Sequence, residues 1–171
     1  IMGDIVLINE FIFFLNVFVK QLIIQFILVC LDKMGIFGHS MGGHGALICA
    51  LRKTGMYKSV SAFSPICNPI NCEWGKKNFE NYLGDDKESW KEYDATELIK
   101  KYNGPPVEIF IDQGSEDKFL KDQLLPNTFV QAASKTQVSC IFKMREGYDH
   151  SYFFIASFMR EYMEYHAKFL K

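Results

Sequence analysis

Residues 34–53 read Met-Gly-Ile-Phe-Gly-His-Ser-Met-Gly-Gly-His-Gly-Ala-Leu-Ile-Cys-Ala-Leu-Arg-Lys, and this stretch decides the fold. The apolar run 34–37 is typical of a buried strand, and the apolar run 45–51 is typical of a helix. Between them Gly-His-Ser-Met-Gly forms a sharp turn, so the order is strand, Gly-x-Ser-x-Gly, helix. This order indicates a nucleophile elbow with Ser40 as the attacking residue. The alternative is a glycine-rich turn that carries its serine incidentally.

The glycines around Ser40 have expected steric roles. The turn of a nucleophile elbow is strained, so we expect side chains at Gly38 and Gly42 to collide with neighbouring backbone. We expect Gly43 and Gly45 to let the helix approach the sheet closely. The amide of Met41, at the start of the helix, can donate a hydrogen bond to a developing oxyanion. The stretch therefore predicts one donor of an oxyanion hole beside the nucleophile.

The composition limits the classes of function. The chain has 171 residues, of which 49% are hydrophobic and 23% charged, as is usual for one soluble globular domain. A net charge of −1 gives no reason to expect nucleic acid or an anionic membrane as a partner. The five cysteines include no Cys-x-x-Cys motif, which favours free thiols in a reducing compartment. No histidine lies near other metal-binding residues at ligand spacing, so we expect no metal.

Residues 1–31 differ from the rest of the chain, because the run 11–31 is almost wholly apolar. A membrane-spanning helix would need about 20 apolar residues and would carry Lys20 near its middle, so we do not favour it. A secretory signal is not consistent with Asp4 and Glu10. A buried helix, or a segment that replaces another one, is the third interpretation. No period of 3.6 or 2 residues decides among them.

Strands and helices alternate along the remaining chain. Further strands are predicted at 59–64, 107–111 and 138–144, and helices at 94–102, 119–135 and 151–170, with short helices in the irregular region 65–106. We expect Pro126 at a break or start within its helix. Phe154, Phe158, Tyr162, Tyr165 and Phe169 recur every three to four residues and predict the buried face of the last helix. The alternation predicts an α/β fold with a parallel sheet.

Three side chains follow strands of this sheet, where parallel sheets place their functional sites. Ser40 follows the first strand, Asp117 the third and His150 the fourth. A serine hydroxyl becomes a nucleophile when an imidazole accepts its proton, and an acid holds the imidazole in the required tautomer. The order Ser, Asp, His is that of the α/β-hydrolase layout. The acids that remain as alternatives to Asp117 are Asp112, Glu116, Asp122 and Asp149.

The other histidines are weaker candidates than His150. His39 and His44 flank the elbow and are expected to be packing or surface residues. His166 lies within the last helix, and we expect it on a solvated face. For His150 itself, the alternative is a loop histidine that caps the last helix.

Several segments closely resemble the S-formylglutathione hydrolase family, also called esterase D. They include Ile-Phe-Gly-His-Ser-Met-Gly-Gly-His-Gly-Ala-Leu within 36–47, Tyr-Lys-Ser-Val-Ser-Ala-Phe-Ser-Pro within 57–65 and Glu-Gly-Tyr-Asp-His-Ser-Tyr-Phe-Phe-Ile at 146–155. Residues 112–120 resemble the acid loop of the same family. The resemblance covers about residues 32–171.

The resemblance implies an α/β-hydrolase fold and a cytoplasmic, cofactor-free thioesterase that hydrolyses S-formylglutathione to formate and glutathione. It also implies activity on small carboxylic esters and a homodimer. Carried over by position, Ser40 is the nucleophile, His150 the general base, Asp117 its orienting acid and Met41 an oxyanion donor.

Before residue 32 the resemblance stops, and we expect residues 1–31 to be an atypical segment beside the hydrolase-like part 32–171. Members of the family carry about half their length before the elbow. We therefore expect a truncated sheet and an incomplete version of the enzyme. An acyltransferase on the same fold and an inactive remnant that binds a partner or membrane are the alternative functions.

Overall fold

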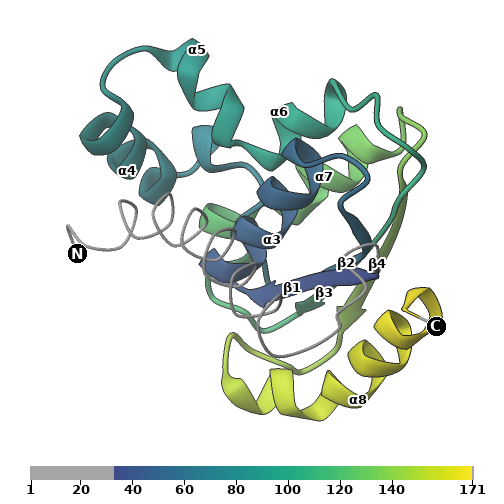
Figure 1. Ribbon diagram of the computed structural model, residues 1–171. Coiled ribbons are helices and arrows are strands. Elements are labelled where there is room, and N and C mark those ends of the chain that lie inside the picture. Colours follow the sequence, from purple (N-terminus) through teal and green to yellow (C-terminus); the bar gives the residue numbers. More distant parts are fainter. Residues whose placement is uncertain (1–32, 171) are drawn as a thin grey trace, which may run out of the picture.

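A four-stranded parallel sheet forms the centre of the molecule, in a computed structural model that describes residues 33–170 (Figure 1). Its strands are β1 (Met34–His39), β2 (Tyr57–Phe63), β3 (Glu108–Gly114) and β4 (Ser139–Arg145). Their order in space is their order in the chain, and every neighbouring pair is parallel. The predicted α/β fold with a parallel sheet is confirmed, and all four strands lie close to their predicted positions.

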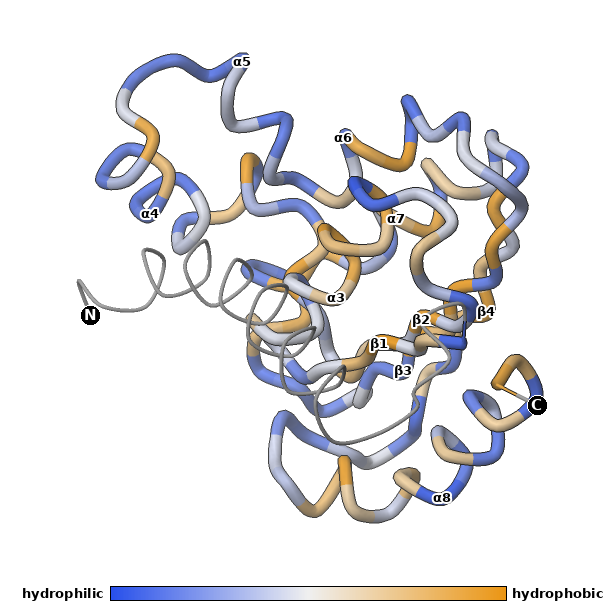
Figure 2. Tube along the Cα trace, in the orientation of Figure 1, coloured by the Kyte–Doolittle hydropathy of each residue, from blue (hydrophilic) through white to orange (hydrophobic). Residues whose placement is uncertain are grey.

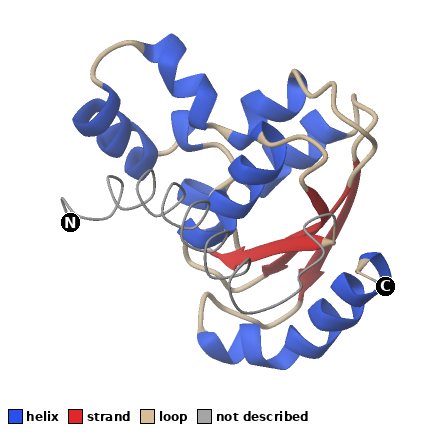
Figure 3. Cartoon of the chain, viewed as in Figure 1, coloured by secondary structure: helices blue, strands red, loops and turns tan. Residues whose placement is uncertain are grey.

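Helices cover both faces of this sheet (Figure 3). On one face lie α3 (Met41–Arg52), α6 (Ala95–Lys100) and α7 (Pro126–Ala133), and on the other lies α8 (Tyr152–Phe169). The predicted short helices of the irregular region are also present. They are η2 (Pro69–Asn71), α4 (Glu73–Leu83), α5 (Lys87–Trp90) and η3 (Lys91–Tyr93).

Two apolar cores separate the sheet from its helices, and Figure 2 shows apolar residues concentrated along the strands and α3. Under α3, α6 and α7 the core includes Leu47, Val60, Ile109 and Phe129, all fully buried. Under α8 it consists mainly of aromatic residues. The predicted buried face of α8 is confirmed, since Phe154, Phe158, Tyr162, Tyr165 and Phe169 all pack in this second core.

The ring of His166 is buried in the same layer, so the prediction of a solvated face is wrong. Its Nδ1 and Nε2 each lie 2.7 Å from a serine hydroxyl oxygen, of Ser59 and Ser61 respectively. Both serines point toward α8, because they are two positions apart on β2. A histidine with both nitrogens paired can be buried at little cost. The apolar spacing of α8 gave no sign of these two hydroxyl partners.

Three boundaries differ from the sequence prediction for local reasons. The helix after the elbow begins at Met41, since the two glycines that follow are accommodated in its first turn. β3 continues through Gly114, because it pairs with β4 up to Arg145. The predicted helix 119–135 is divided into a π-helical turn, η4 (Leu120–Leu124), and α7, with Leu125 between them at φ 50°. Pro126 was expected at a break or at the start of a helix, and it is the first residue of α7.

Residues 1–32 lie outside the described part of the chain, together with every interpretation offered for the run 11–31. From residue 33 to residue 170, no helix combines the length and apolar character needed to cross a membrane. The four cysteines in this range are free thiols, namely Cys49, Cys67, Cys72 and Cys140.

Candidate active site

The carboxyl edge of the sheet brings together the loops that carry the predicted residues. β1 ends at His39 and is followed at once by Ser40. Asp117 lies three residues after the end of β3, and His150 lies in the loop that leads from β4 to α8. Because all strands are parallel, these three loops open on the same edge.

Ser40 has the strained backbone expected of a nucleophile elbow. Its φ of 55° and ψ of −116° lie in a region that residues with a side chain rarely adopt. Backbone hydrogen bonds hold this conformation. The Ser40 amide donates to the Phe63 carbonyl at 2.9 Å, and the Ser40 carbonyl accepts from the His44 amide at 2.9 Å. The turn is thereby fixed to β2 on one side and to α3 on the other.

The glycines around the elbow have unequal roles. A Cβ at Gly38 would lie 2.3 Å from the Gly42 carbonyl oxygen, which confirms the expected collision. A Cβ at Gly43 would lie 3.1 Å from the Cβ of Pro65, which confirms its close approach. The expectations for Gly42 and Gly45 are wrong, because within residues 33–170 a Cβ at either position would meet no atom within 4 Å. These two glycines lie on faces of α3 that are turned away from the sheet.

Asp117 and His150 form a hydrogen-bonded pair. The Nδ1 of His150 lies 2.6 Å from the Oδ2 of Asp117, whose carboxylate is buried. Two further donors reach the carboxylate, namely the Phe119 amide at 2.9 Å and the Gln113 Nε2 at 3.0 Å. Burial alone would raise the pKa of Asp117, but hydrogen bonds from His150, Phe119 and Gln113 outweigh it and lower the pKa. Asp117 is therefore held as a carboxylate beside the imidazole.

The rival acids are engaged elsewhere or exposed. Asp112 forms a bidentate ion pair with Arg145, at 2.8 and 2.9 Å, and Arg145 also binds Glu161 of α8 at 2.6 Å. This network points into the layer between the sheet and α8, away from His150. Asp149 accepts the Ser151 amide at 3.0 Å at the start of α8. Glu116 and Asp122 are exposed, and neither hydrogen-bonds His150.

Backbone contacts join the two loops that carry the pair. The Glu116 amide donates to the Tyr148 carbonyl at 2.9 Å, and the Gly147 amide donates to the Ser115 hydroxyl at 2.9 Å. Gly114 permits this approach, because a Cβ there would lie 2.2 Å from the Tyr148 carbonyl oxygen. The distance between Asp117 and His150 is thus set by backbone as well as by their own hydrogen bond.

Two other rings contact the ring of His150. The His39 ring is 4.5 Å away between centroids, and the Phe119 ring meets it edge-on at 5.2 Å. Over residues 33–170, the Ser40 hydroxyl makes no hydrogen bond, and His150 is bonded through Nδ1 alone. Catalytic hydrogen bonds of this kind often form when substrate is bound.

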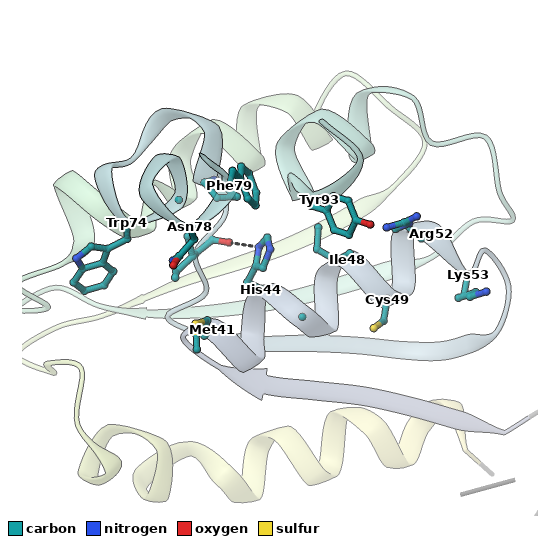
Figure 4. Close-up of a pocket in the computed structure, with 14 residues that line it drawn as sticks. Met41, His44, Ile48, Cys49, Arg52, Lys53, Trp74, Asn78, Phe79 and Tyr93 are labelled. Atoms are coloured by element: carbon teal, nitrogen blue, oxygen red, sulfur yellow. Dashed lines mark hydrogen bonds between the residues drawn. The ribbon is translucent and has the colours of Figure 1, made fainter. Parts of the chain in front are cut away.

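A pocket of about 400 Å³ lies along α3, on the side that faces α4 and η3 (Figure 4). Met41, Ile48, Phe79 and Tyr93 are among its lining residues, while Ser40, Asp117 and His150 are not. His44 also lines it and bonds the Ile66 carbonyl through Nδ1 at 2.9 Å. Burial lowers the pKa of His44 to about 4, against a smaller opposite effect of its backbone hydrogen bonds. His44 is therefore neutral near pH 7. Of the two expectations for it, a packing or a surface residue, packing is confirmed.

Sequence reasoning assigned no role to two residues that contact the pair. Gln113 is fully buried, and a buried amide at the carboxyl end of a strand is the signal that could have identified it. His39 was expected to be a packing or surface residue, and it packs, but the sequence did not show that its contact would be the ring of His150. The described residues contain no group of three or more His, Cys, Asp or Glu side chains that could hold a metal ion.

Comparison with protein families and relatives supports the assignment of the fold. Residues 20–165 match the family model Esterase, described as "Putative esterase". This match begins before residue 32, so it includes part of the segment that showed no resemblance by its motifs. The chain is 57% identical over 140 residues to S-formylglutathione hydrolase of Bos taurus, and 55% identical over 139 residues to that of Arabidopsis thaliana.

These alignments cover 81% of the chain but 50% and 49% of the two relatives. The chain thus spans about half the length of the curated relatives it matches. A solved S-formylglutathione hydrolase from Agrobacterium tumefaciens superposes with a TM-score of 0.86 at 39% identity, over 92% of this chain and 57% of that one. An S-formylglutathione hydrolase from Staphylococcus aureus, at 20% identity and a TM-score of 0.70, shares the fold. The expected α/β-hydrolase fold and the resemblance to this group of esterases are confirmed.

Proposed function

The chain belongs to the esterase family, and from that premise we propose that it is a serine thioesterase that hydrolyses S-formylglutathione to formate and glutathione. Ser40 is the nucleophile, His150 the general base and Asp117 the acid that orients it. The observation that carries the proposal is the buried hydrogen bond between Asp117 and His150, on the edge of the sheet where Ser40 occupies a strained turn. High identity to S-formylglutathione hydrolases supports the choice of substrate.

In the acylation step, the Ser40 hydroxyl oxygen attacks the thioester carbonyl carbon while the Nε2 of His150 accepts the hydroxyl proton. Asp117 keeps the proton of His150 on Nδ1 and stabilises the imidazolium that forms. The amide of Met41 is one of the first N–H groups of α3, which have no acceptor within the helix, so it can donate to the oxyanion. Breaking of the carbon–sulfur bond releases glutathione, whose sulfur takes the proton from His150.

In the deacylation step, a water molecule gives a proton to His150 and attacks the formyl ester of Ser40. Collapse of the second tetrahedral intermediate breaks the bond to the Ser40 oxygen, which takes the proton from His150, and formic acid is released and ionises to formate in water. Small carboxylic esters react by the same two steps, with an alcohol as the first product. No cofactor takes part in this scheme. By analogy with the family, the proposal also includes a cytoplasmic location and a homodimer.

The test is hydrolysis of S-formylglutathione and p-nitrophenyl acetate by the purified chain. We expect turnover that falls to background in Ser40→Ala and persists in Ser134→Ala, a matched change at an exposed serine on the far end of α7. A fluorophosphonate probe should label wild type and not Ser40→Ala. Turnover that is the same in both variants would refute the role of Ser40.

Product analysis in the presence of an acceptor alcohol tests the acyltransferase alternative. An acyl-enzyme that hydrolyses gives formate as the main product, whereas a transferase gives a formate ester. A folded chain that neither turns over substrate nor reacts with the probe would favour the inactive remnant over the thioesterase.

A further inference from the structure

His39 is the least explained side chain near the candidate triad. It is the last residue of β1, its ring centroid lies 4.5 Å from that of His150, and the two planes are tilted by 43°. Its Nε2 is buried and has no hydrogen-bond partner among residues 33–170. A buried polar atom without a partner costs free energy, so the side chain of His39 is not placed there for its hydrogen bonds within the described residues, and its contact with the ring of His150 is the feature to be explained.

Two rings contact the ring of His150, namely the tilted ring of His39 and the edge-on ring of Phe119. These contacts restrict rotation of the His150 ring, whose Nδ1 meets Asp117 at 2.6 Å. Burial lowers the pKa of His39 first, and the positive form of His150 lowers it further, while Asp117 opposes both. His39 is therefore neutral whenever His150 acts as a base near neutral pH.

The neighbouring elements carry further ionisable groups. In the loop after β3, Asp117 bonds His150, and the ammonium of Lys118 lies 4.9 Å from the centre of the Phe119 ring. From the loop before α8 and its first turn come Asp149 and Tyr152, whose ring lies 6.2 Å from His39. Of these groups, Asp117 alone is buried.

We propose that His39 is a positioning residue for the esterase reaction: its neutral ring holds the ring of His150 against Phe119 and on Asp117. This inference rests on the proposed function of the triad. During acylation His150 takes the Ser40 proton and becomes positive. A neutral, polarisable neighbour tolerates that charge, whereas a cation at the position of His39 opposes it.

The test compares His39→Phe, His39→Gln and His39→Lys across pH. Phe keeps a flat neutral ring and should lose the least kcat, Gln should lose about tenfold because the ring is less constrained, and Lys should lose more. The decisive readout is the acid limb of the profile of kcat/KM. In the Lys variant its midpoint should move about one pH unit lower than in the Gln variant, because the cation disfavours protonated His150.

A merely structural role would lower the plateau in all three variants and leave the midpoint in place, and that result would overturn the proposal. If the Lys variant does not fold, the reciprocal measurement replaces it. In His150→Phe, the ring protons of His39 followed by NMR should titrate at higher pH than in wild type, since the repulsion from His150 is gone.

The NMR titration needs no turnover, so it separates this proposal from the thioesterase assignment. If the chain lacks activity but His39 titrates at higher pH in His150→Phe, the interaction between the two histidines is supported and the proposed function is refuted. An active chain in which His39 titrates identically with and without His150 loses the coupling and retains the function.

Discussion

The proposed nucleophile and the proposed acid–base pair occupy the same edge of the sheet, but different interactions hold them. Ser40 is fixed by backbone: a strained φ, two backbone hydrogen bonds at 2.9 Å and the close approach at Gly38. Asp117 and His150 are fixed mainly through their side chains: within residues 33–170, the buried carboxylate of Asp117 receives hydrogen bonds from His150, from Gln113 and from the Phe119 amide, and the rings of His39 and Phe119 contact the imidazole.

This difference means that the two halves of the site should fail in different ways. A side-chain change near the pair should reduce activity while the fold persists, because the loops are also joined by their backbone. A backbone change at the elbow should reduce stability, because the strain at Ser40 is balanced by the packing of the β1–α3 turn. Four substitutions test this contrast.

The largest effect is expected from Asp117→Asn, which preserves shape but favours the wrong tautomer of His150. We expect kcat to fall by about 10³–10⁴, with a midpoint of urea unfolding close to that of wild type. The matched control is Asp149→Asn, next to His150 but bonded to the Ser151 amide, which should stay within about twofold. Equal losses in both variants would mean that Asp117 is not the orienting acid.

Gly38→Ala tests the backbone-held half. The new methyl group would lie 2.3 Å from a carbonyl oxygen, so we expect about 3 kcal/mol or more of lost stability in urea unfolding. Gly42→Ala adds the same methyl group where no atom of the described residues lies within 4 Å, and it should be neutral or slightly stabilising. If Gly38→Ala is as stable as wild type, the turn can relax around the new methyl group, and the elbow is less dependent on its backbone geometry than we infer.

His44, in the helix that follows the elbow, makes the free energy of unfolding depend on pH. Its pKa is about 4 in the folded chain and 6.5 when unperturbed, so its contribution to stability is present above pH 6.5 and lost as the pH falls toward 4. The loss amounts to at most about 3 kcal/mol. His44→Gln, which can still donate to the Ile66 carbonyl, should show a smaller fall in unfolding free energy between pH 7 and 4.5. Parallel curves for wild type and variant would exclude this contribution.

The smallest effect is expected from Gln113→Leu, which removes one of three donors to the Asp117 carboxylate. We expect kcat to fall about tenfold, since the remaining donors from Phe119 and His150 keep the acid in place. Gln137→Leu is the matched control, because Gln137 is exposed and its side chain donates to the Gly104 carbonyl, away from Asp117. A loss as large as that of Asp117→Asn would show that the pair depends on Gln113 alone.

Much of this architecture can be predicted from the sequence, because strands, helices and the elbow depend on local patterns. The run Met34–His39 and the spacing of aromatic residues along α8 each specify one element and one buried face. The candidate triad also follows from local order, since each of its members comes after a strand. Local patterns therefore sufficed to place the loops on one edge of the sheet.

What the sequence did not reveal depends on pairs of residues far apart in the chain. His166 is buried because two serines of β2 meet both of its nitrogens, more than 100 positions away. Gly42 was expected to lie against neighbouring backbone, and Gly45 was expected to let α3 approach the sheet. A Cβ at either position would meet no atom of the described residues within 4 Å, whereas a Cβ at Gly38 or Gly43 would. The positions at which a side chain would collide depend on the angle between α3 and the sheet, and the composition of the segment does not specify that angle.

The docking of α8 has a consequence for biosynthesis. Tyr162 donates to the Ala62 carbonyl, 100 positions earlier, so the ribosome releases β2 long before its covering helix exists. During that interval the aromatic face of the sheet, including Phe63 and Phe110, is open to chaperones and to other nascent chains. His150 is synthesised in the same late segment. The turn at Ser40 is therefore synthesised well before the proposed base, and under the proposed function hydrolysis can begin only after residues 150–169 have emerged.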